Sequence, residues 1–162
     1  MSLAITGTAC LVFRDNSFRW IDLKHFTFGA GSPDELLLAQ LFAHPHFADG
    51  YVGGGHGASG IHGPYQLAAI TPASYRLIGP DEAIAWLNEF CSLFESPPYG
   101  PLAGDIDAIV RRRLGQSTSV LRLGVLEPAA QHDCGWILGE FRELIAIRRD
   151  AAELTLLVMG ID

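Results

Sequence analysis

Lysine is almost absent from this sequence, and basic residues as a group are outnumbered. Lys24 stands beside ten arginines, against 18 acidic residues, for a formal net charge of −7. A field of that sign repels nucleic acid and anionic lipid, so we expect neither as a partner. The sequence also lacks an apolar run long enough to cross a membrane, and its N-terminus lacks the pattern of an export signal. We therefore expect a cytoplasmic protein with no membrane partner.

Cysteine is scarce, and the three present lie far apart at Cys10, Cys91 and Cys134. An odd number of scattered cysteines is typical of reduced thiols rather than of a disulfide framework, which again favours the cytoplasm. The strong preference for arginine over lysine is typical of GC-rich bacterial genomes, so we expect a bacterial source.

Hydrophobic residues are plentiful, at 49% of 162 residues, while charged residues make up only 18%. That balance excludes a mainly disordered chain and provides enough apolar surface for a core. The length suits one ordinary domain, so we expect residues 1–162 to form a single α+β domain.

Two predicted hairpins define the expected sheet. Residues 3–13 alternate apolar and small polar side chains, and residues 18–23 follow after a turn. Near the other end, residues 141–148 and 154–159 are two strand candidates joined by a short polar turn. Further strands are expected at 75–78 and 119–127. The order of elements lacks regular βαβ alternation, so we predict a mainly antiparallel sheet covered by about three helices.

The three helices have recognisable beginnings. Ser32-Pro33-Asp34-Glu35 predicts a helix over 33–43 that is capped by Ser32 and is apolar on nearly every side. Helices over about 80–95 and 105–114 are expected on the same grounds, joined by a proline-rich connector.

The segment 44–65 breaks the pattern, with seven glycines between Gly50 and Gly63. Residues 55–60 match the spacing of a dinucleotide-binding fingerprint, but no strand precedes them and Pro64 prevents the helix that the motif requires. Ser59 likewise lacks the strand-to-helix turn of a nucleophilic serine. We therefore expect no nucleotide cofactor here.

The same segment holds most of the histidines, and it is the candidate site. Imidazole and carboxylate groups bind zinc and similar divalent metals, and a glycine-rich backbone can bring distant ligands together. The spacing matches none of the recognised zinc motifs, so the preferred interpretation is a polar loop without metal. The candidate ligands of the alternative, a metal site, are His44, His46, Asp49, His56 and His62.

Two further places carry reactive side chains. His132-Asp133-Cys134 brings a thiol, an imidazole and a carboxylate together, although neighbours in sequence seldom have the geometry of a catalytic triad. Glu143 lies among apolar strand residues and would need a partner if buried, for which Arg122 or Arg142 is available.

No motif identifies a specific activity, so two hypotheses remain. The first is a binding or protein-interaction module without a cofactor. Both faces of the last hairpin are apolar, so helices or another chain must cover the second face, and self-association as a homodimer would fit. The second is a metal-dependent or histidine-based enzyme with its site in the glycine- and histidine-rich segment 44–65.

Overall fold

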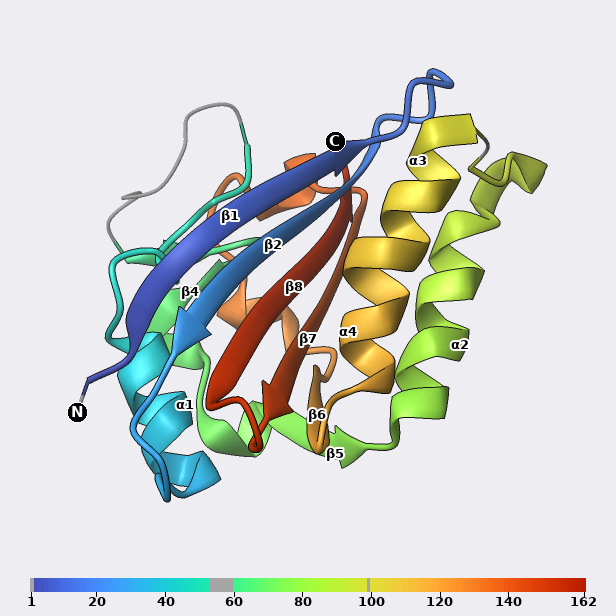
Figure 1. Ribbon diagram of the computed structural model, residues 1–162. Coiled ribbons are helices and arrows are strands. Elements are labelled where there is room, and N and C mark those ends of the chain that lie inside the picture. Colours follow the sequence, from blue (N-terminus) through green and yellow to red (C-terminus); the bar gives the residue numbers. More distant parts are fainter. Residues whose placement is uncertain (1, 53–59, 99) are drawn as a thin grey trace.

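The computed structural model describes residues 2–52, 60–98 and 100–162, and these form a six-stranded sheet with helices on both faces (Figure 1). The strands lie in the order β1-β2-β8-β7-β6-β5, and each neighbouring pair is antiparallel. Their bounds are β1 Ala4–Val12, β2 Arg19–Thr27, β5 Tyr75–Ile78, β6 Ser119–Leu123, β7 Glu140–Arg148 and β8 Glu153–Ile161. The predicted α+β class and both terminal hairpins are confirmed.

The two terminal hairpins lie side by side in the sheet. β2 pairs with β8 over its whole length, from Arg19 opposite Ile161 to Thr27 opposite Glu153. Among the described residues, β1 pairs only with β2, so in this part of the chain β1 forms one edge of the sheet and β5 forms the other. The predicted strand over 119–127 ends at Leu123, and Val125 beyond it is exposed.

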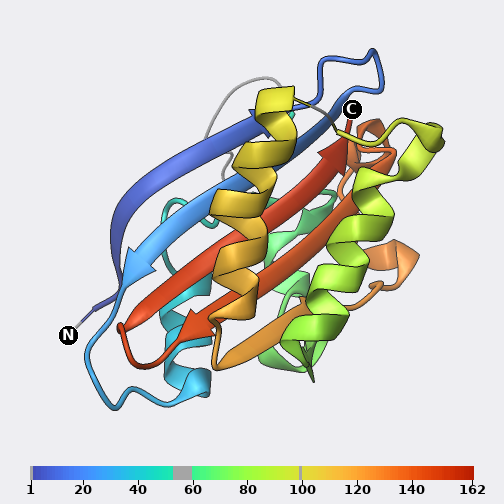
Figure 2. The ribbon, with the colours of Figure 1, turned by 45° about the vertical axis from the view of Figure 1, so that its right-hand side comes forward.

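Helices cover both faces of the sheet (Figure 2). On the first, the α1 face, Leu37 and Leu41 pack with Leu154 and Leu156. On the second, the α2 face, Leu87, Phe90 and Val110 pack with Leu144 and Leu157. Because side chains alternate along a strand, the apolar residues of β8 serve both cores. The second face of the last hairpin is thus covered by helices of the same chain.

Helix α1, Asp34–Phe42, is shorter and more one-sided than expected. It buries Leu37, Leu38 and Leu41, whereas Leu36 is exposed, so the expectation that so apolar a helix would be deeply buried was wrong. The predicted Ser32 cap was also wrong. Pro33 occupies the N-cap position, and the Ser32 hydroxyl instead donates to the Gly29 carbonyl at 2.8 Å.

The described residues form two further helical bodies. α2 runs from Pro80 to Cys91, four residues short of the expected end. After the proline-rich connector, α3 Gly100–Asp105, a π-helical stretch Ile106–Arg111 and α4 Arg112–Gly115 follow one another, so this helix begins five residues earlier than predicted. Short 3-10 turns occupy Leu67–Ala69, Pro72–Ser74, Leu93–Glu95, Pro128–Ala130 and Gly135–Ile137. No helix in the described ranges has the length and apolarity that crossing a bilayer would require.

The described parts of the glycine- and histidine-rich segment, 44–52 and 60–65, pack on the α1 face, and β3 Ile61–His62 forms a small hairpin there with β4 Tyr65–Gln66. Gly63 turns between them with a φ of +52°, and a Cβ there would lie 2.4 Å from the Phe141 ring. Glycine is therefore needed at this position both for the backbone angle and for the close approach.

Candidate functional site

The five residues proposed as metal ligands lie in different surroundings. His56 and most of the fingerprint pattern, Ser59 included, lie outside the described residues. His44 and His46 are neighbours, with ring centroids 5.4 Å apart, and His44 accepts a hydrogen bond from the His46 backbone. Burial, together with the nearby His46, lowers the pKa of His44. Within residues 2–52, 60–98 and 100–162, no three His, Cys, Asp or Glu side chains are grouped so that they could hold a metal ion.

Asp49 belongs to a buried ion pair on the sheet. Its carboxylate accepts a hydrogen bond from the Lys24 ammonium at 2.6 Å and another from the Tyr51 backbone at 2.9 Å. Lys24 is itself buried, and its ammonium also donates to the Tyr51 hydroxyl at 3.1 Å. This contact pins the segment that follows α1 to β2.

His62 is buried on the same face, where both of its ring nitrogens are hydrogen-bonded. Nδ1 lies 2.5 Å from the Phe47 carbonyl, which can only accept, so Nδ1 carries a proton. Nε2 contacts one carboxylate oxygen of Glu143, and the other accepts from the Tyr75 hydroxyl at 2.5 Å. The Phe47 ring stacks on the imidazole with centroids 3.8 Å apart. His62, Glu143 and Tyr75 therefore form one hydrogen-bonded group in the interior of the α1 face.

The expected arginine partner of Glu143 was wrong, and strand geometry explains why. Arg142 precedes Glu143 on β7, so its side chain lies on the opposite face, where it donates to Glu140, Glu89 and the Trp86 carbonyl. Arg122 pairs across the sheet with Leu144 and so shares that other face, with its guanidinium 3.8 Å from the Trp86 ring centroid.

Tyr51 contacts both the Lys24–Asp49 ion pair and the hydrogen-bonded group around His62. Its ring stacks on Trp20 at 5.6 Å and meets His62 edge-on at 5.8 Å, although its φ of 56° is a left-handed value that bulky residues rarely adopt. Burial, followed by the charge of Glu143, raises the pKa of Tyr51 and that of Tyr75 well above 10.

These tyrosines predict an alkaline limit to stability. We expect the free energy of unfolding to fall as the pH rises above about 10, because the unfolded chain ionises both tyrosines there while the folded chain keeps them neutral. Urea denaturation across this range measures the fall, which should be shallower in the double variant Tyr51→Phe/Tyr75→Phe. Parallel pH profiles for the two proteins would contradict it.

The His132-Asp133-Cys134 group does not activate its thiol. His132 Nε2 donates to the Gly63 carbonyl at 2.9 Å, and Nδ1 accepts from the Cys134 backbone at 3.2 Å. With both nitrogens bonded to backbone groups, the imidazole is not placed to take the proton of the exposed Cys134 thiol.

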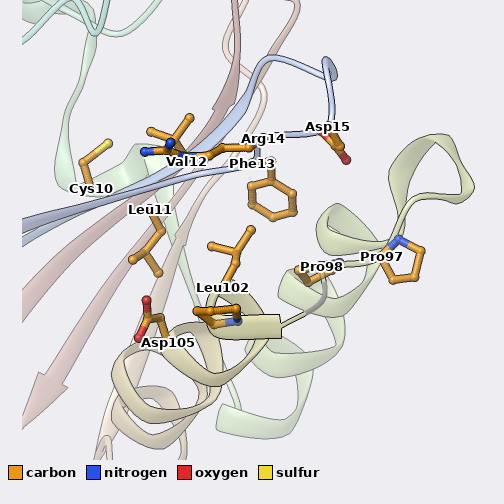
Figure 3. Close-up of a pocket in the computed structure, with 11 residues that line it drawn as sticks. Cys10, Leu11, Val12, Phe13, Arg14, Asp15, Pro97, Pro98, Leu102 and Asp105 are labelled. Atoms are coloured by element: carbon orange, nitrogen blue, oxygen red, sulfur yellow. The ribbon is translucent and has the colours of Figure 1, made fainter.

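A groove of about 450 Å³ lies elsewhere, along the edge strand β1 (Figure 3). Figure 3 shows Leu11 and Phe13 pointing toward Leu102 of α3, with Pro97 and Pro98 of the connector beyond. Six consecutive residues, Cys10 to Asp15, line it. Three of these residues, Cys10, Leu11 and Val12, belong to β1. Successive side chains of a strand point to opposite faces, so lining by three consecutive strand residues indicates that the groove borders the backbone edge of the strand.

Along an edge strand, successive residues alternate between pointing their backbone N–H and C=O groups toward the neighbouring strand and pointing them away from the sheet. Phe13 N donates to the Arg19 carbonyl at 2.9 Å, so Phe13 points its backbone groups toward β2, and in this register Leu11 does the same. The backbone groups of Cys10 and Val12 therefore point away from the sheet. None of the nine residues of β1 is charged, so the edge lacks the lysines that commonly protect such strands.

Two exposed aromatic residues near the groove have unfavourable backbone angles. Phe18, in the turn after β1, has a φ of 58°, and Phe94, just before the connector, has a φ of 60°. Both are 67% exposed. A left-handed angle costs a side-chain-bearing residue about 1–2 kcal/mol, and strain of this kind is concentrated at functional sites.

Arg19 joins the two sides of the groove. It is fully buried, and its guanidinium donates to the carbonyls of Phe90 and Cys91, at 3.0 and 2.7 Å, and of Ser96, at 2.5 Å. On the hairpin side it donates to Asp15 at 2.8 Å. Hydrogen bonds from Ser17, then from Ser96 and Arg19, lower the pKa of the Asp15 carboxyl far below its usual value.

Comparison with known proteins adds no family to this description. No family model matches the chain, and neither a curated protein nor a solved structure resembles it significantly.

Proposed function

We propose that this protein is an interaction module that binds an extended segment of a partner protein by strand addition at β1. The observation that carries the proposal is the groove along the open edge, lined without interruption from Cys10 to Asp15. An incoming strand would pair with the outward-facing backbone groups of Cys10 and Val12, and these main-chain hydrogen bonds supply affinity in such complexes.

The apolar wall of the groove supplies selectivity. A residue opposite Leu11 would have its side chain on the same face, between Leu11 and Leu102 (Figure 3). The volume lies within the range of pockets that hold small ligands or side chains, roughly 300–1,000 Å³. An apolar side chain at that position is the anchor that we expect of the partner segment.

A reducing bacterial cytoplasm suits this proposal. Cys10, the first of the consecutive residues that line the groove, and Cys134 are both exposed free thiols, which oxidation would cross-link or modify outside such a compartment. The alternative, an enzyme whose site includes His62, is less favoured. His62 is 0% exposed and Glu143 is 1% exposed, so a substrate has no access to that pair.

Selection from a random peptide library displayed on phage tests the proposal. Peptides enriched by the purified protein should bind it in solution and should lose at least about tenfold in affinity for the variant Val12→Pro. Proline at position 12 removes an outward N–H without removing a bond to β2, a substitution that edge strands tolerate.

The matched control is Leu77→Asp, which changes an exposed apolar residue on the opposite edge strand and should leave binding unchanged. Thermal unfolding of each variant establishes that it is folded. Enriched peptides that bind the folded Val12→Pro variant as well as the wild type would overturn strand addition.

A further inference from the structure

Strand addition by itself does not define which side chains the partner segment carries. The charges around the groove favour one kind of segment. Opposite residues of adjacent antiparallel strands share a face. Partner residues opposite Cys10 and Val12 would therefore lie on the α1 face of the sheet, and a partner residue opposite Leu11 would lie on the α2 face, beside Leu102.

Two carboxylates lie near the partner positions opposite Cys10 and Val12. Asp22 lies directly across β1–β2 from Cys10, with the Lys24 ammonium 3.8 Å away. Asp162 accepts a hydrogen bond from the Trp20 indole at 2.8 Å, and Trp20 lies opposite Val12. Partial burial, followed by the charges of Asp22 and Asp162, raises the pKa of the Cys10 thiol.

The groove itself provides little positive charge. Arg14 is the basic residue among those that line it, where Asp15 and Asp105 are acidic, and the chain as a whole carries −7. An extended ligand with basic residues would thus meet complementary charge both at the edge and at longer range.

Resting on the proposed function, we infer that the partner segment is cationic, with lysine or arginine opposite Cys10 and Val12 and an apolar residue between them opposite Leu11. A second copy of this chain fits less well. Its own edge strand carries no charge, and two copies would repel each other through their net charges.

Three synthetic heptapeptides that alternate valine with lysine, glutamine or glutamate test the inference. Each can place its valines toward Leu102 and its polar residues toward Asp162. In fluorescence anisotropy titrations we expect the lysine peptide to bind at least about tenfold more tightly than the glutamine peptide, and the glutamate peptide to bind most weakly. The preference should shrink between about 50 and 200 mM salt, because screening weakens attraction between exposed charges.

The variant Asp162→Asn should reduce the preference for lysine, since asparagine can still accept the bond from Trp20 without the charge. Asp133→Asn makes the same charge change at an exposed site away from the groove and should leave the preference intact.

Equal binding of all three peptides, abolished by Val12→Pro, would overturn the cationic partner while leaving strand addition in place. Failure of all three to bind would also overturn it, and the library selection then decides strand addition separately. Dimerisation in sedimentation experiments, lost in Val12→Pro, would identify a second copy as the occupant and likewise overturn the inference.

Discussion

Replacing Glu143 with leucine should lower the free energy of unfolding by about 2–6 kcal/mol, because two buried polar partners lose their hydrogen bonds, at about 1–3 kcal/mol each. The substitution leaves His62 Nε2 and the Tyr75 hydroxyl buried without their partner. Folded domains are stable by only about 5–15 kcal/mol, so urea denaturation will show the loss as a large shift of the midpoint.

The triple variant His62→Phe/Tyr75→Phe/Glu143→Leu is the matched control for that experiment. It removes all three polar groups together, and a phenyl ring can keep the stack on Phe47. Apolar replacement of a complete buried polar group is often nearly neutral, so we expect this variant to be more stable than Glu143→Leu alone. The Phe47 carbonyl still loses its donor, which costs about 1 kcal/mol. If the free energy of unfolding of Glu143→Leu lay within about 1 kcal/mol of the wild-type value, the importance of this buried group would be refuted.

Arg19→Met should be comparably destabilising, by about 3–5 kcal/mol, and should also abolish peptide binding. Methionine fills similar space but leaves three backbone carbonyls and the Asp15 carboxylate without the guanidinium. Because those groups belong to the hairpin turn on one side and to the end of α2 and the connector on the other, the two sides of the groove lose their link.

Arg19→Lys should lose less stability than Arg19→Met but should not match the wild type, because one ammonium cannot reproduce the planar fork of donors. The control Arg148→Met removes a partly exposed arginine that bonds the exposed Asp150 and should change stability by less than about 0.5 kcal/mol. Peptide affinity unchanged in a folded Arg19→Met variant would separate Arg19 from the groove.

Local signals in the sequence were enough to predict most of the fold. Alternation of apolar residues located both terminal hairpins, and Pro80 with the acidic residues after it located the start of α2. The signal at Ser32 failed because a cap depends on backbone angles: Pro33 has the extended angles of an N-cap residue, and Ser32 bonds the preceding turn instead.

The sites were harder to predict, because they depend on contacts between distant parts of the chain. His62 and Glu143 meet only because the segment after α1 folds back over β7. The residues that flank His62 and Glu143 in the sequence do not indicate this contact. The opposite faces of Arg142 and Glu143, by contrast, follow from strand periodicity alone and could have excluded that pairing. The groove joins β1 to a helix about ninety residues later, and its one signal in the sequence is the uncharged character of the first strand.

The position of β8 in the sheet has a consequence for how the chain acquires its structure during synthesis. β8 lies between β2 and β7, although it is the last strand along the chain, so the first hairpin and the β5–β6–β7 part share no strand pairing until residues 153–161 have left the ribosome. Before then, β2 and β7 both present open edges and unburied apolar side chains, which invite chaperones and non-native association. Insertion of β8 closes contacts between residues that lie far apart in the sequence, as between Arg19 and Ile161, and a topology of this kind favours slow completion of folding.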